Sequence, residues 1–180
     1  MHCWVGYSET KRDLAQELSA VMTEFPRLKV ILAHFGLGFD AETLPRIHAL
    51  LKQHKNLYLD TSLYGAFCEL WFTRASNRAA ALRELVLAFP RQILWGTDVF
   101  GSRLKDAQEY KDAIRASALL LEFENLQCAE FTRTAYFEDG GTDKYGSKSF
   151  APLDLKGLGL SSHPDILENI LWKNAERLFA

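Results

Sequence analysis

Three residues that could bind a metal ion or carry a proton follow apolar runs or lie close to where one would end. His34 comes directly after the apolar residues 30–33, and Asp98 follows the short run that begins at Ile93. His2 precedes the first helical pattern by a short loop, so it could end a strand of its own. Imidazole nitrogens and carboxylate oxygens are the ligands of catalytic zinc and related divalent ions, which lower the pKa of a bound water. These residue types therefore indicate metal-assisted chemistry.

The elements that must position these residues are predicted strands at residues 30–33, 57–59 and 93–95. Near-continuous apolar runs are typical of parallel strands that are covered on both faces. Thr61 and Ser62 follow the second run. In parallel α/β folds the catalytic groups gather at the carboxyl ends of the strands. We therefore expect His34 and Asp98 at the ends of neighbouring or near-neighbouring strands, with His2 on the same rim.

Helical patterns separate the runs. Apolar residues recur at helical spacing from Leu14 to Phe25, where Ser8 or Thr10 could cap the helix and Pro26 ends it. Two further patterns run over residues 44–54 and 82–89, the second ended by Pro90. The alternation of helix and strand predicts repeated βαβ units with right-handed crossovers.

The pattern changes after the third run. Residues 104–132 are helix-like, and residues 139–152 form a polar loop that contains glycine. We interpret residues 104–155, approximately, as an insertion into one domain that spans residues 1–180. A closing helix is predicted from Pro164, with Ile166, Ile170, Leu171 and Leu178 near one face.

Composition limits the classes of partner. The chain has 180 residues, 48% of them hydrophobic and 24% charged, and a formal net charge of −2, which is typical of a soluble globular protein. No basic excess favours nucleic acid, and no apolar stretch approaches the roughly 20 residues that span a bilayer. Three separated cysteines indicate neither a disulfide framework nor a metal pair. We expect a cytoplasmic protein that binds a small-molecule substrate.

Spacing alone leaves two interpretations of the candidate site open. His2 and His34 could instead be hydrogen-bonded histidines at strand ends, with Asp98 ordering a loop. For His48, His54 and His163 the structural interpretation is favoured, because they lie beside a helix stripe, near a helix end and at a helix start.

Four stretches carry a family resemblance: LKVILAHFG at 28–36, NLYLDTS at 56–62, ILWGTD at 93–98 and ILWKNAERLF at 170–179. In this order they resemble the later strands and last helix of the amidohydrolase-related family. That family includes metal-dependent hydrolases and aminocarboxymuconate-semialdehyde-decarboxylase-like enzymes. The resemblance implies an α/β fold that is the C-terminal portion of a TIM (β/α)8 barrel, with about four parallel strands, helices and a helical insertion.

The resemblance also implies roles for the three candidate residues. His2 corresponds to the metal ligand of the fifth strand, and His34 to the sixth-strand histidine that binds metal or the metal-bound water and substrate. Asp98 corresponds to the eighth-strand metal ligand and proton carrier. The implied catalytic residues are Asp98 and His34, and the implied cofactor is a divalent metal, with Zn²⁺ expected.

One part of the family pattern is missing, because the sequence contains no His-x-His pair. We therefore expect an incomplete barrel in which metal is weakly held or absent, and whose exposed strand edges promote self-association or aggregation. The expected function is that of a hydrolase acting on a small organic acid, amide or ester, or of a related non-oxidative decarboxylase. The alternative is a non-catalytic α/β remnant that binds a partner without turnover.

Overall fold

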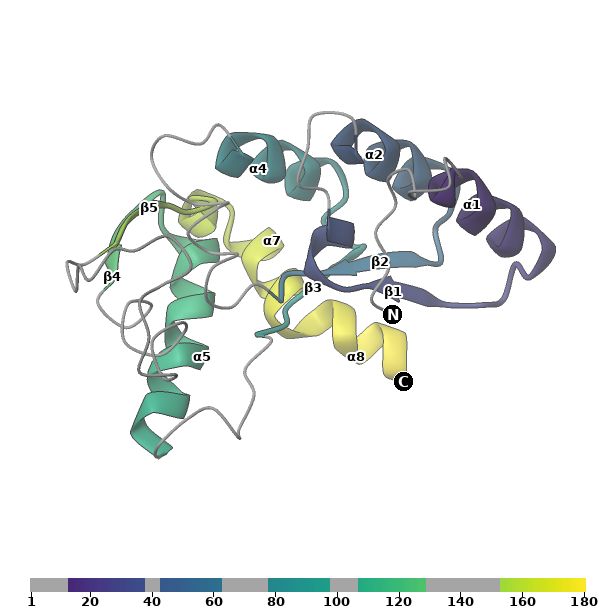
Figure 1. Ribbon diagram of the computed structural model, residues 1–180. Helices are drawn as coiled ribbons and strands as arrows, with labels where there is room; N and C mark the ends of the chain where they lie inside the picture. The colour runs from purple at the N-terminus through teal and green to yellow at the C-terminus, as the bar shows by residue number, and fades with distance from the viewer. Residues whose placement is uncertain (1–12, 38–42, 63–77, 98–106, 129–152) are drawn as a thin grey trace, which may run out of the picture. The chain divides into compact units, whose positions relative to one another are not determined.

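The structure is a computed structural model that describes residues 13–37, 43–62, 78–97, 107–128 and 153–180 (Figure 1). His2 and Asp98 lie outside the described residues. The chain divides into two compact units. The first comprises Met1–Ser62, Leu85–Gly96 and Asn169–Ala180, and the second comprises Leu63–Glu84 and Thr97–Glu168.

A parallel sheet of three strands forms the centre of the first unit. The strands β1 (Val30–Leu32), β2 (Leu57–Asp60) and β3 (Ile93–Leu94) lie in the order β1-β2-β3. Leu32 is paired with Leu59, and both side chains are fully buried, as expected for strands covered on both faces. The three predicted strands and their parallel direction are confirmed. The fourth expected strand, which would lead to His2, falls outside the described residues.

Helices of the first unit pack against this sheet and against one another. Helix α1 (Leu14–Glu24) lies beside α2 (Thr43–Gln53), as Figure 1 shows, and α2 also contacts β2. Helix α8 (Asn174–Phe179) and the π-helical turn η4 (Asn169–Lys173) contact β3. Helix α4 (Arg78–Ala88), which belongs to the second unit up to Glu84 and to the first from Leu85, confirms the third predicted helix.

The last helix is fixed to the sheet by a buried amide. Asn174 is almost fully buried, and its Nδ2 donates to the carbonyl oxygens of Pro90 at 2.8 Å and Ile93 at 2.6 Å. Lys29 Nζ donates to the carbonyl oxygen of Leu178 at 2.7 Å, where a cation also compensates the negative end of the helix dipole. The C-terminal helix is therefore joined to the start of β1 and to β3.

The second unit contains helix α5 (Ala107–Glu122) and an antiparallel pair, β4 (Asn125–Cys128) with β5 (Leu153–Lys156). The helix predicted over residues 104–132 is therefore wrong beyond Glu122. The segment after β5 hydrogen-bonds to the end of α5, since Leu158 N donates to the carbonyl oxygen of Leu120 at 2.8 Å. Pairing with a distant strand overrides local helix propensity here. The predicted polar loop, residues 139–152, lies outside the described residues.

The closing helix is interrupted, which corrects the prediction of one continuous helix. Helix α7 (Pro164–Glu168) begins at Pro164 as predicted, and the π-helical turn η4 separates it from α8. The carbonyl oxygen of Ile170 accepts a bond from Trp95 N at 2.9 Å. A π turn inserts an extra residue into the helix, so positions on either side no longer share one face. Ile170 and Leu178 are buried, whereas Ile166 and Leu171 are partly exposed.

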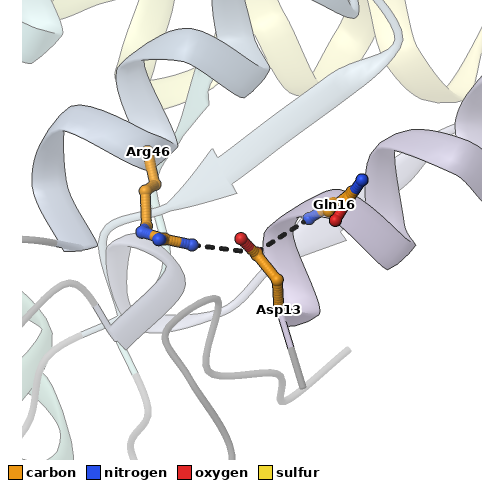
Figure 2. A network of polar contacts seen from close by, with 3 residues as sticks. All are labelled: Asp13, Gln16 and Arg46. Carbon is orange, nitrogen blue, oxygen red and sulfur yellow. Dashed lines mark hydrogen bonds and ion pairs between the residues drawn. The ribbon is translucent and has the colours of Figure 1, made fainter. Parts of the chain in front are cut away.

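The cap of α1 is Asp13, which corrects the expectation that Ser8 or Thr10 caps this helix. Asp13 has extended backbone angles, and its Oδ1 accepts a bond from Gln16 N at 3.1 Å (Figure 2). Arg46 of α2 donates to the same oxygen at 2.8 Å. The Gln16 amide and, next, the Arg46 guanidinium lower the pKa of Asp13 below its ordinary value of 3.8.

Replacing Asp13 with asparagine should lower the melting temperature slightly at neutral pH, because asparagine keeps the cap but loses the charge that faces Arg46. A carboxylate whose pKa is depressed in the folded state stabilises the fold above its ordinary pKa of 3.8, and this contribution is lost as the pH falls through the lower folded value. Thermal unfolding across the acidic range should show the wild type and Asp13→Asn converging at low pH. A difference that is unchanged below the folded pKa would contradict this assignment.

Among the described residues, no helix is both long enough and apolar enough to cross a membrane.

Candidate active site

Polar side chains gather where the parallel strands of the first unit end. The register pairs Leu32 with Leu59, so the residues after β1 and after β2 leave the sheet at the same edge. His34, Thr61 and Ser62 follow these strands, and all three are buried, with 4%, 6% and 7% of their surface exposed. A buried polar group needs partners, so their hydrogen bonds define the local geometry.

The ring of His34 is oriented by Ser62. His34 Nδ1 hydrogen-bonds to the main-chain carbonyl oxygen of Ser62 and lies 3.2 Å from Ser62 Oγ. A carbonyl oxygen only accepts, so Nδ1 must carry the proton. In the neutral ring, Nε2 is then the nitrogen with the lone pair, which is the atom that can coordinate a metal ion or accept a proton.

Asp60, the last residue of β2, accepts hydrogen bonds from both His34 and Ser62. It is not among the site residues that the sequence predicts. Its Oδ1 accepts bonds from His34 N at 2.9 Å, from Ser62 N at 3.0 Å and from Ser62 Oγ. The available sequence signal was a carboxylate that closes an apolar run two residues before a serine. Its contact with His34 depends on how β1 and β2 are aligned, which the sequence pattern does not give.

The end of β3 approaches this cluster closely because residue 96 is glycine. A Cβ at Gly96 would lie 3.0 Å from Ser62 Cβ and 3.4 Å from Asp60 Cγ. Gly96 N also donates to Thr61 Oγ1 at 3.2 Å. The ends of all three strands therefore meet at this cluster. The position of Asp98 after β3 remains a prediction, as does that of His2.

The described residues contain no group of three or more His, Cys, Asp or Glu side chains that could hold a metal ion. Of the three predicted ligands, only His34 lies in the part of the chain that the structure describes.

The other three histidines have structural contacts. His48 is exposed and meets the ring of Phe89 edge-on, with centroids 4.8 Å apart. His54 is buried, and its Nε2 lies 2.8 Å from Ser19 Oγ. In the second unit, His163 Nε2 lies 3.2 Å from the guanidinium of Arg83. These contacts agree with the structural interpretation of the three side chains.

A parallel α/β sheet with an oriented histidine at its carboxyl edge is typical of α/β enzymes that bind their substrates there. The chain matches the family model described as Amidohydrolase over residues 2–180. It therefore belongs to the amidohydrolase family, which confirms the resemblance seen in the sequence. No curated protein and no solved structure matches the chain.

Family membership has consequences for fold and chemistry. The mixed α/β structure with its three parallel strands is consistent with part of a TIM barrel. Membership indicates a metal-dependent enzyme of hydrolase or decarboxylase type, in a superfamily that generally uses divalent metals.

Proposed function

We propose that this chain contributes to metal-assisted hydrolysis of a small organic acid, amide or ester, or to the related non-oxidative decarboxylation. His34 and Asp98 are the proposed catalytic residues, and His2 completes the proposed ligand set. The observation that supports this most is the bond from His34 Nδ1 to the Ser62 carbonyl, because it leaves Nε2 unprotonated in the neutral ring. Histidine ligands of metal enzymes are commonly held in this way through their other nitrogen.

The chemistry of the donor set fits a divalent ion such as Zn²⁺. His34 would bind through Nε2 and Asp98 through a carboxylate oxygen, with His2 as a further nitrogen ligand. A bound ion would polarise a substrate oxygen and lower the pKa of a coordinated water. The chain's own part is then to orient the His34 ring and, through Asp98, to take up and return a proton near the substrate.

Metal binding by this chain is expected to depend on all three proposed ligands. The sequence offers His2, His34 and Asp98 but no His-x-His pair. A catalytic zinc site normally has three protein ligands, so the loss of any one of these leaves too few. The second candidate function is an α/β domain that binds a partner without turnover.

Replacing His34 with alanine should lower the affinity for Co²⁺, used as a spectroscopic substitute for Zn²⁺, by more than about 10-fold. Removing a residue that only hydrogen-bonds to a metal ligand already lowers metal affinity by about 10–100-fold, so removing a ligand itself should cost at least as much. Titration followed by the d–d absorption of Co²⁺ measures the change. His48→Ala is the matched control, because His48 is an exposed histidine on α2.

Equal Co²⁺ affinity in His34→Ala and His48→Ala would contradict the proposed metal site. Both variants must be folded at the temperature of the titration, which thermal unfolding checks, because His34 is buried and its truncation leaves space. Activity against a panel of small carboxylic acids, amides and esters then separates the enzymatic proposal from the binding domain.

A further inference from the structure

The turn that carries His34 has an unusual backbone. His34 and Phe35 have φ values of 56° and 51°, and Gly36 continues the turn at 68°. L-residues rarely adopt this left-handed region, so two such residues in succession persist only where neighbouring groups hold them. Phe35 is fully buried, and Gly36 N donates to Ala33 O at 2.9 Å.

The carboxylate of Asp60 is the charged group that holds this turn. His34 N donates to Asp60 Oδ1 at 2.9 Å, across from β1 to β2. Hydrogen bonds to an ionised acceptor are stronger than neutral ones. The bond therefore fixes the main chain of His34 at the residue where the left-handed turn begins.

The same oxygen sets the direction of the Ser62 hydroxyl. Ser62 Oγ–H donates to Asp60 Oδ1, so the lone pairs of Oγ remain to accept from His34 Nδ1 at 3.2 Å. Ser62 N also donates to Asp60 Oδ1 at 3.0 Å, which fixes the residue whose carbonyl accepts from His34 Nδ1. Ser62 thus presents two acceptors to one ring nitrogen.

We propose that Asp60 is the positioning residue for His34: it holds the left-handed main chain directly and, through Ser62, holds the ring in the Nδ1–H tautomer. The importance of this tautomer for metal or proton chemistry rests on the proposed function. The positioning itself does not depend on any metal. Asp60 does not need to touch substrate, because both of its effects act through other residues.

Asp60→Asn in the full chain tests the proposal, because asparagine keeps the size of the side chain but removes the charge. Long-range ¹H–¹⁵N spectra recorded at alkaline pH distinguish the two neutral tautomers of a histidine ring, because they show which ring nitrogen carries the proton. The wild type should show Nδ1–H for His34, and the variant a mixture with Nε2–H. The amide proton of His34 should also move upfield. Asp165→Asn makes the same change at an exposed carboxylate and should leave both signals in place.

A wild-type His34 ring in the Nε2–H form would overturn the proposal, as would unchanged His34 signals in Asp60→Asn. If Asp60→Asn does not fold, Asp60→Ser replaces it, because serine also removes the carboxylate that accepts from His34 N and Ser62 N. Asp60→Ser must then show a detectable Nε2–H population, and its absence would also overturn the proposal.

Co²⁺ titration of the same samples separates this inference from the proposed function. Asp60→Asn should weaken Co²⁺ binding by about 10-fold if His34 is a ligand. If the wild type binds no Co²⁺ at His34, the metal proposal fails, while the tautomer spectra still decide whether Asp60 positions the ring.

Discussion

Gly157→Ala is expected to destabilise the second unit by about 3 kcal/mol or more, because overpacking against atoms that cannot move is among the costliest single changes. A Cβ at Gly157 would lie 2.1 Å from the carbonyl oxygen of Phe123 and 2.5 Å from that of Leu120. Both are main-chain atoms at the end of α5. Urea denaturation gives the loss of unfolding free energy, and hydrogen exchange should show lost protection at the α5 C-terminus and in β5.

Gly159→Ala, two residues later, is the comparison variant and is expected to destabilise the second unit less than Gly157→Ala. Gly159 has φ 61°, but its added Cβ would meet Glu124 Cβ at 3.2 Å, which is a side-chain atom. Its cost should be nearer the roughly 1–2 kcal/mol of a left-handed L-residue. Equal stability of Gly157→Ala and the wild type would show that the segment after β5 does not pack on α5 as described.

Gln92→Leu should destabilise the first unit by about 2–4 kcal/mol, since the carbonyl oxygens of Leu51 and Leu57 lose this donor and each buried acceptor left without a donor costs about 1–3 kcal/mol. Gln92 is buried, and its Nε2 lies 3.2 Å from Leu51 O, 2.9 Å from His54 O and 2.8 Å from Leu57 O. The side-chain amide of Gln92, the residue before β3, thus contacts the end of α2, the turn after it and the start of β2. Thermal and urea unfolding measure the effect.

Gln53→Leu is the matched control, because Gln53 is exposed on α2. It should change the unfolding free energy by less than about 0.5 kcal/mol. A similar loss in both variants would mean that leucine itself, and not the stranded carbonyls, causes the destabilisation. The result would then contradict the role given to the Gln92 amide.

The three strands of the sheet could be predicted because the residues of each strand indicate it without reference to any distant part of the chain. Each of the three runs is apolar along its length, so burial on both faces is visible without any partner. His34 could be placed at a strand end for the same reason. The sequence pattern does not identify the cap at Asp13, because the cap of a helix that begins at Leu14 is the residue just before it and periodicity defines a helix boundary only approximately.

The features that could not be predicted all depend on long-range contacts. Strand β4 pairs with β5 across residues 129–152, a partner that is distant in sequence, whereas its local pattern predicts helix. The π turn η4 coincides with the bond from Trp95 N to Ile170 O, which joins distant parts of the sequence. Asp60 reaches His34 only because of the register between β1 and β2. Sequence patterns identify residue types at strand ends but not which of them meet.

Anomalous scattering from crystals of the chain grown with zinc tests most directly whether His34 and Asp98 share one metal site. The expected result is an ion about 2.0–2.1 Å from His34 Nε2 and about 2.0–2.2 Å from a carboxylate oxygen of Asp98, with His34 Nδ1 still bonded to Ser62. Zinc found only at His48, His54 or His163, or bound to His34 through Nδ1, would contradict the account.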